Sequence, residues 1–163
     1  MPARPRRYWL VKSEPELYAL GDLERDRRTA WEGVRNYQAR NSMKDDMAPG
    51  DLVLFYHSNA EPTGVVGLAK VASAAHADET QFDPDSDYYE RGATRADPRW
   101  MCVDVAFVER FAKVVTLAEL KADPELDGML VTRRGMRLSV QPVELGHFRR
   151  VLALGRARTK LPK

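Results

Sequence analysis

The sequence LVLFYH, Leu52–His57, opens the longest run of the chain without a charged side chain. A turn sequence, Pro49-Gly50-Asp51, precedes it, and its residue types are those that favour β-strands. Two further strands are predicted at residues 64–71 and 100–111, with only short helical patterns between them. No regular strand–helix alternation follows, which predicts an α+β domain built on a small, strongly curved mixed sheet or barrel.

The whole chain has 163 residues, enough for one domain with a substantial core. We expect a single domain over residues 6–155, because no repeat or linker-like segment divides the sequence. The run that begins at Leu52 is nine residues long, against the roughly 20 that a membrane helix needs. Residues 1–7 are basic but lead into no apolar signal sequence.

The chain has one cysteine, Cys102, and three histidines. An internal disulfide is therefore impossible, and no Cys/His spacing is typical of a zinc site. These observations predict a cytoplasmic protein without a metal or another cofactor.

The net charge of +2 is distributed unevenly. Residues 1–7 and 156–163 hold seven basic side chains and no acidic one, so the body between them carries a net charge of −5. We interpret residues 1–5 and 156–163 as basic, flexible tails. If the partner is a nucleic acid, affinity should come from a local pocket and these tails, because an acidic body does not attract a phosphate backbone.

Several helices and a first strand are indicated by local signals. Residues 8–12 are rich in strand-forming types, and Ser13 then begins a turn that could lead into a helix with a buried stripe of Leu17, Leu20 and Leu23. Asn36 is a candidate cap for a helix to about residue 47. Two more helices are predicted, from the capping box at residues 116–119 to residue 122 and from Pro142 to residue 154, the latter ended by Gly155.

Two segments combine aromatic and polar side chains. Residues 31–41, WEGVRNYQARN, place two aromatic rings and two arginines around a predicted helix start, where anions bind favourably. In residues 100–107, strand periodicity puts Met101, Val103, Val105 and Phe107 on a core face. The same periodicity puts Trp100, Cys102 and Asp104 on the opposite, partly exposed face, which would suit the wall of a pocket for a planar ring.

The sequence offers little support for common enzyme chemistry. Neither a phosphate-binding loop nor a dinucleotide fingerprint is present, and Gly64 and Gly67 are better explained by a bend or by close packing in a strand. The chain contains residue types that could form a Ser-His-Asp or Ser-Lys hydrolase site, but no recognisable motif brings them together. Those residues are Lys12, Ser13, His57, Ser58 and Asp104.

Residues 77–99 form a long segment rich in turn signals, including Tyr88 and Tyr89. A loop of this length in a compact domain is usually functional or mobile. The sequence leaves open whether it closes over a ligand or forms a static lobe.

Five blocks occur in a defined order along the chain: YWLVKSEP (8–15), WEGVRNYQARN (31–41), GDLVLFYHS (50–58), PRW (98–100) and RLSVQPV (137–143). Together they resemble the EVE domain. The resemblance implies a fold of the PUA-like superfamily, a curved β-pseudobarrel with short peripheral helices that is related to the YTH reader domains. It also implies a non-catalytic reader of a modified nucleobase, such as methylated or hydroxymethylated cytosine or methyladenine, in DNA or RNA.

By this resemblance the base would stack on aromatic rings, an interaction worth roughly 1–3 kcal/mol per base. Candidates for the rings are Trp31 and Trp100, followed by Tyr37 or Tyr89. Candidates for the polar edge of the base are Lys12, Ser13, Asn41, Ser58 and Asp104. Candidates for the flanking phosphates are Arg35, Arg40 and Arg137.

Bacterial members of the family resemble the recognition halves of defence systems, so the output of this chain could lie with an effector protein partner. Two alternatives remain: a sensor of a free nucleoside or another small planar ligand, and an enzyme that acts on a modified base. The oligomeric state is undetermined by the sequence.

Overall fold

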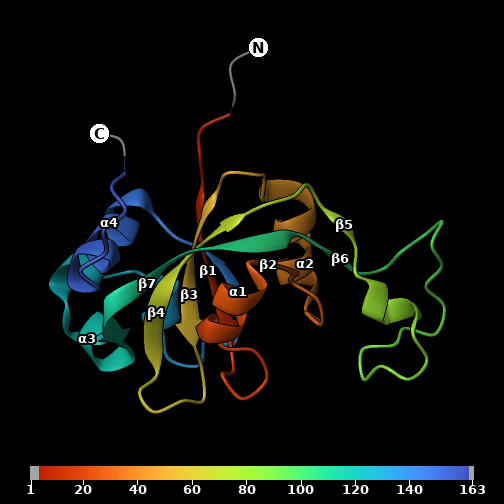
Figure 1. The fold of residues 1–163 in the computed structure, drawn as a ribbon, viewed down its shortest axis with the longest axis horizontal. Helices are drawn as coiled ribbons and strands as arrows, with labels where there is room; N and C mark the ends of the chain where they lie inside the picture. The colour runs from red at the N-terminus through yellow and green to blue at the C-terminus, as the bar shows by residue number, and fades with distance from the viewer. Residues whose placement is uncertain (1–3, 162–163) are drawn as a thin grey trace.

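A computed structural model describes residues 4–161 of the chain. Its main element is a six-stranded mixed sheet in the order β2-β7-β4-β3-β1-β8 (Figure 1). The strands of this sheet are β1 (Tyr8–Ser13), β2 (Arg28–Ala30), β3 (Leu52–His57), β4 (Gly64–Val71), β7 (Asp104–Thr116) and β8 (Val140–Pro142). Strands β1 and β3 run parallel, and the other neighbours are antiparallel. The predicted α+β architecture on a curved mixed sheet is confirmed.

The sheet curls because β4 approaches β7 unusually closely and irregularly. The register shifts twice between these strands, and such bulges increase twist. A Cβ added at Gly64 would lie 2.2 Å from the carbonyl oxygen of Val115, and one at Gly67 would lie 2.6 Å from that of Glu109. The prediction that both glycines allow close packing is therefore confirmed.

Short helices cover the two faces of the sheet. The α-helices are α1 (Leu20–Asp26), α2 (Tyr37–Asn41), α3 (Leu117–Ala122) and α4 (Leu145–Leu154). A π-helix, η1 (Ser42–Asp46), extends α2, and three 3-10 helices are η2 (Glu79–Phe82), η3 (Pro124–Leu126) and η4 (Leu130–Thr132). One buried cluster lies towards α1, α2 and η1 and includes Trp31 and Phe55; the other lies towards α3 and α4 and includes Leu54 and Phe148.

Several predicted element boundaries are confirmed. The side chain of Asn36 accepts a hydrogen bond from the amide of Ala39 and caps α2, and η1 carries the helix on to residue 46. Thr116 and Glu119 form the predicted capping box of α3. Gly155 ends α4.

Two predicted helix starts are wrong. Pro142 is the last residue of β8 and pairs with Trp9, so α4 begins three residues later. Leu17 is exposed, because the chain makes a turn in which the amides of Leu17 and Tyr18 both donate to the carbonyl of Glu14. Helix α1 starts only at Leu20, which is buried together with Leu23.

The predicted division of residues 100–107 into a core face and an exposed face is also wrong. Trp100 and Cys102 are buried, as are Val103 and Val105. The alternation fails because the strand is interrupted: β6 (Met101–Cys102) pairs with β5 (His76–Ala77), and Val103 separates it from β7.

Residues 78–99 form a lobe at the opposite end of the sheet from α3 and α4 (Figure 1). Buried Gln81 holds the lobe to Trp100, the residue before β6, because its side chain accepts from the amide of Trp100 and donates to the carbonyl of the same residue. The two ends of the described chain contact the body: Arg4 donates to Asp51, and the amide and hydroxyl of Thr159 donate to the buried Glu109. Residues 1–3 and 162–163 of the predicted tails lie outside the described residues.

Within residues 4–161, none of the helices has the length and apolar composition needed to cross a membrane.

Candidate nucleic-acid interface

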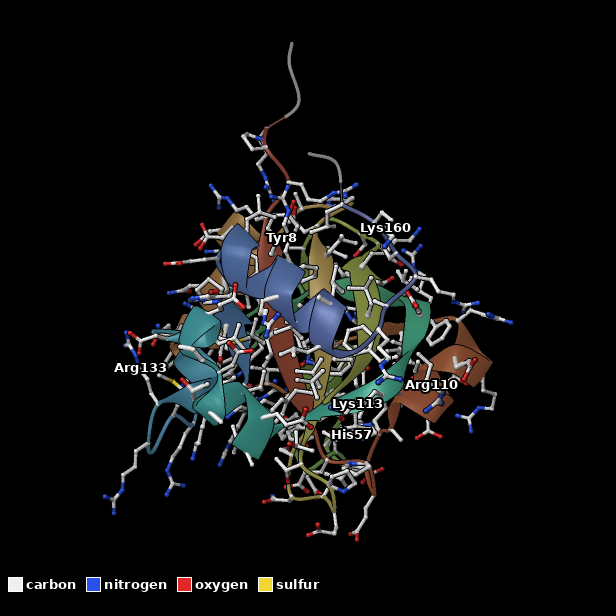
Figure 2. All side chains as sticks on the ribbon, turned by 90° about the vertical axis from the view of Figure 1, so that its left-hand side faces the viewer. Tyr8, His57, Arg110, Lys113, Arg133 and Lys160 are labelled. Carbon is white, nitrogen blue, oxygen red and sulfur yellow. The ribbon has the colours of Figure 1, made fainter. Side chains whose placement is uncertain are left out.

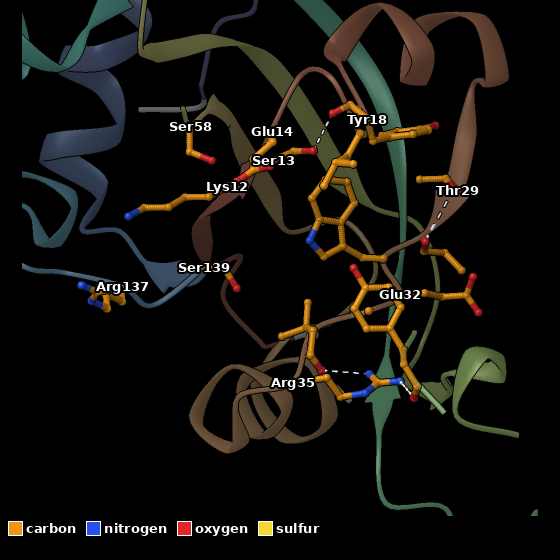
Figure 3. Close-up of a pocket in the computed structure, with 16 residues that line it drawn as sticks. Lys12, Ser13, Glu14, Tyr18, Thr29, Glu32, Arg35, Ser58, Arg137 and Ser139 are labelled. Carbon is orange, nitrogen blue, oxygen red and sulfur yellow. Dashed lines mark hydrogen bonds between the residues drawn. The ribbon is translucent and has the colours of Figure 1, made fainter. Parts of the chain in front are cut away.

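A cavity of about 490 Å³ opens where the parallel strands β1 and β3 end. Its walls come from these ends, from the segment after β2, from the segment before β8 and from the lobe (Figure 3). It is lined by Lys12, Ser13, Glu14, Leu17, Tyr18, Thr29, Ala30, Trp31, Glu32, Gly33, Val34, Arg35, Ser58, Tyr88, Arg137 and Ser139. Its volume falls within the roughly 300–1,000 Å³ that small-molecule sites occupy.

Trp31 is the aromatic residue most firmly built into this cavity. Trp31 is 8% exposed, and its ring stands edge to face against Phe55, with ring centroids 5.5 Å apart, and against Tyr18, at 6.3 Å. Its backbone amide donates to the carbonyl of Val103. Within residues 4–161 the indole N–H has no hydrogen-bond partner, so a ligand acceptor can take that position.

Several polar side chains of the cavity are donors with spare capacity, beside the carboxylates of Glu14 and Glu32. Figure 3 shows Lys12, Ser58, Ser139 and Arg137 along one side of the cavity. The Lys12 ammonium donates to the carbonyl of Met136 at 2.9 Å and has further protons to offer, and burial lowers its pKa. Among the described residues, the guanidinium of Arg137 has neither a hydrogen-bond partner nor an ion-pair partner.

Tyr88 and Arg35 form the wall on the lobe side. Arg35 donates to Asp78, to Thr80 and to the backbone carbonyl of Tyr88, and its guanidinium lies 5.3 Å from the centre of the Tyr88 ring. Gly33 has a φ of +85°, and a Cβ there would lie 2.9 Å from the same ring. Arg35 therefore fastens the lobe, and both its terminal nitrogens are occupied by protein acceptors rather than free for a phosphate.

Asp78 is the buried anion that receives this arginine. Burial alone would raise the pKa of its carboxyl, but hydrogen bonds from Thr80, from the Gly33 amide and from Arg35 outweigh it and hold the pKa below its usual value. The lobe is thus anchored to the segment that carries Trp31.

Trp100 and Tyr37, both predicted for the base pocket, lie outside the cavity. Their rings stack on each other with centroids 4.8 Å apart, and Arg35 covers the Trp100 ring at 5.0 Å. Arg40 lies 4.7 Å from the Tyr37 ring, and its guanidinium donates to Asn41 and to the carbonyl of Arg99. Residues 37, 40, 41 and 100 therefore form a separate aromatic and cationic stack, because α2 packs against β6.

Tyr89 and Asp104 also lie outside the cavity. Tyr89 is exposed on the lobe, and its neighbour Tyr88 takes the place in the wall. The carboxylate of Asp104 is occupied on both oxygens, by Arg28 at 2.9 Å and by His76 at 2.7 Å. Asp104 thus ties β2 and β5 to β7.

The His76–Asp104 pair predicts a pH-dependent stability. Partial burial disfavours the charged ring, but hydrogen bonds to Asp104 and to the carbonyl of Ala77 outweigh it and raise the pKa of His76 above 6.5. A raised pKa in the folded state adds stability below the unfolded value, and this stability is lost as the pH rises through the folded value.

The His76 pair should therefore lower the stability to urea at about pH 8.5 relative to about pH 6, whereas His57, whose pKa is lowered, changes the stability in the opposite direction. In His76→Gln this part of the pH dependence should disappear. An unchanged profile in that variant would show that other groups cause it.

The structure does not bring the candidate hydrolase residues together as a catalytic triad. The Nε2 of His57 accepts from the amide of Leu20, and burial followed by the charge of Arg110 lowers the pKa of its ring. The Ser13 hydroxyl donates to the carbonyl of Tyr18. Neither residue is hydrogen-bonded to the other or to Asp104 within the described chain.

Sequence reasoning missed several cavity residues. Glu32, Gly33 and Ser139 lie inside the sequence blocks that resemble the EVE domain. Their position in those blocks could have marked them as candidate site residues. Glu32 accepts from the amide of Glu79, and burial followed by the charge of Asp78 raises its pKa. Tyr88 had no signal that separated it from Tyr89.

Comparison with known proteins gives consistent matches over almost the whole chain. The family model described as the EVE domain matches residues 7–154. Human thymocyte nuclear protein 1 is 37% identical over 167 aligned residues, which cover 90% of this chain and 73% of the human protein.

Two solved structures show the same fold. A hypothetical protein from Leishmania major is 45% identical, with a TM-score of 0.88 and coverage of 95% of this chain and 98% of that one. The human THYN1 protein, solved in complex with DNA containing 5-methylcytosine, is 36% identical, with a TM-score of 0.84 and coverage of 94% and 99%. The predicted PUA-like pseudobarrel is confirmed by these neighbours.

Proposed function

The chain belongs to the EVE domain family, and we propose that it binds a modified cytosine, carried by a nucleic-acid strand, in the cavity around Trp31. The observation that carries the proposal is the buried Trp31 ring, whose indole N–H is without a partner in the described structure and which lines a cavity of about 490 Å³. A flipped or single-stranded base stacks on such a ring and offers acceptors to such a donor.

The donors of the cavity favour cytosine over thymine or uracil. Trp31, Lys12 and Arg137 can only donate hydrogen bonds. The polar edge of cytosine presents two neighbouring acceptors, the ring nitrogen N3 and the carbonyl oxygen O2. In thymine and uracil the same ring nitrogen carries a proton and would face these donors with a donor of its own.

The structure of human THYN1 with DNA containing 5-methylcytosine supports the same assignment by homology. A methyl group adds about 0.8 kcal/mol of burial, which corresponds to about fourfold in affinity. A larger preference for the methylated base would require displaced water or close contact at the methyl position.

We also propose that the chain binds without catalysing a reaction. The residues that could have formed a nucleophile and base, Ser13 and His57, make hydrogen bonds to the backbone instead.

The proposed location is intracellular, where nucleic acid is found. The homologous human protein, thymocyte nuclear protein 1, carries the word nuclear in its name, whereas a cytoplasmic location is the proposal for this chain.

The test is a titration of the wild-type chain, followed by its tryptophan fluorescence, with one short single-stranded oligonucleotide whose central base is varied. The base is cytosine, 5-methylcytosine, 5-hydroxymethylcytosine, thymine, adenine or N6-methyladenine, in DNA and RNA. Thymine carries the same methyl group as 5-methylcytosine, so this pair isolates the hydrogen-bonding edge, whereas cytosine and 5-methylcytosine isolate the methyl group.

We expect 5-methylcytosine or its hydroxymethyl form to bind most tightly and thymine to bind weakly. Equal binding of all the oligonucleotides would overturn the proposal. Equal affinity for the free nucleoside and the oligonucleotide would favour a small-molecule sensor, and chemical conversion of the base would favour an enzyme.

A further inference from the structure

Three arginines within five residues, Arg133, Arg134 and Arg137, lie on the loop between η4 and β8. We infer that this loop, residues 133–137, holds the backbone phosphates next to the bound base. The inference rests on the proposed function and extends it from the base to the strand.

The charge of this loop is unpaired. All three side chains are exposed, and within residues 4–161 none of them has a hydrogen bond or an ion pair from its guanidinium. Several other arginines of the body are engaged: Arg28 with Asp104 and Arg150 with Asp123, for example. Three free guanidiniums in one turn therefore concentrate positive charge on a body whose sequence is net acidic.

The loop is fixed to the rim of the cavity. The carbonyl of Met136 accepts from the Lys12 ammonium at 2.9 Å, and the carbonyl of Ser139 accepts from the Lys12 amide at 2.9 Å. Arg137 itself lines the cavity, on the same side as Lys12 (Figure 3). Arg133 is three residues from Met136, so their Cα atoms are at most about 11 Å apart.

The loop is also built as a rigid turn. The amide of Met136 donates to the carbonyl of Arg133, and Gly135 has a φ of +74°, which favours glycine. Leu138 is buried, and its carbonyl accepts from the side chain of the buried Gln141. The backbone is therefore held from both sides while the guanidiniums point to solvent, where Arg133 lies at the edge of the molecule (Figure 2).

A phosphate backbone is the partner that fits this arrangement. Guanidinium binds phosphate through two parallel hydrogen bonds, and a base in the cavity necessarily brings its neighbouring phosphates to the rim. The acidic body repels the strand elsewhere, so the loop would also set the direction in which the strand leaves the cavity.

The test is the double variant Arg133→Ala/Arg134→Ala, which leaves the cavity residue Arg137 in place. Its control is Lys70→Ala/Lys121→Ala, which removes the same charge from exposed side chains that do not line the cavity. Affinity for the 5-methylcytosine oligonucleotide is measured between 50 and 200 mM salt, together with the ratio of affinities for methylated and unmodified oligonucleotides.

For single strands, two lost phosphate contacts lower the salt slope by about 1.4. Over that salt range, wild type should lose about sevenfold more affinity than the arginine variant. The methylation ratio and the affinity for the free 5-methylcytosine nucleoside should be unchanged, and the lysine control should behave as wild type.

A salt slope equal to that of wild type in the arginine variant would overturn the inference, as would an equal decrease in the lysine control. Failure of the proposed function is seen separately, because wild type itself would then lack a preference for the modified base.

Discussion

Replacing Trp31 with alanine is expected to lower the affinity for a modified-cytosine oligonucleotide about a hundredfold. The variant loses the ring on which the base would stack and the N–H that would meet its acceptor edge. The same ring packs edge to face against Phe55 and Tyr18, so its removal should also cost about 3–5 kcal/mol of folding free energy. Urea unfolding, measured beside the titration, separates the two losses.

Trp31→Phe distinguishes binding from folding. Phenylalanine keeps an aromatic ring in the core but is smaller and lacks the indole N–H, so we expect a much smaller stability loss than in Trp31→Ala and an affinity lower by about three- to tenfold. The affinity difference between 5-methylcytosine and thymine should shrink in this variant.

Trp9→Phe is the matched control. The indole of Trp9 donates to the buried Asp51 and does not line the cavity, so this variant should lose stability while its binding is unchanged. Full binding by a folded Trp31→Ala protein would remove Trp31 from the proposed site.

Replacing Gly64 with alanine is expected to destabilise the fold strongly, although it adds only one methyl group. The new Cβ would lie 2.2 Å from the carbonyl oxygen of Val115 and 2.7 Å from the Cα of Thr116. Both are backbone atoms of the paired strand β7, so no side chain can rotate away. We expect a loss of about 3 kcal/mol or more and a decrease in Tm of about 10 °C.

The control for this change is Gly92→Ala. A Cβ at Gly92 meets no atom within 4 Å, and the stability of this variant should stay within about 0.5 kcal/mol of wild type. If Gly64→Ala unfolds at the same temperature as Gly92→Ala, the close approach of β4 and β7 does not limit the fold.

Local signals in the sequence predicted much of the fold correctly. The cap at Asn36, the capping box at Thr116 and the end of α4 at Gly155 are confirmed, because each depends on residues a few positions apart. The start of α4 was predicted wrongly at Pro142, because pairing with β1 extends the strand past the local helix signal.

The candidate site was predicted only in part. Lys12, Ser13, Trp31 and Ser58 line one cavity together with Arg35 and Arg137. Trp100 and Asp104 do not, although their residue types suit a base pocket equally well. The lobe covers Trp100, and Arg28 and His76 occupy Asp104.

The sequence by itself determined the family, the approximate positions of four of the strands and the blocks from which the cavity is made. These properties reside in residue order and in hydrogen bonds between near neighbours. Only the tertiary structure decided which polar groups remain free for a ligand. Arg35 forms an ion pair with Asp78, 43 positions along the chain, whereas Arg137 has no acidic partner among the described residues. Such pairing depends on which distant segments fold against each other, and no local pattern encodes it.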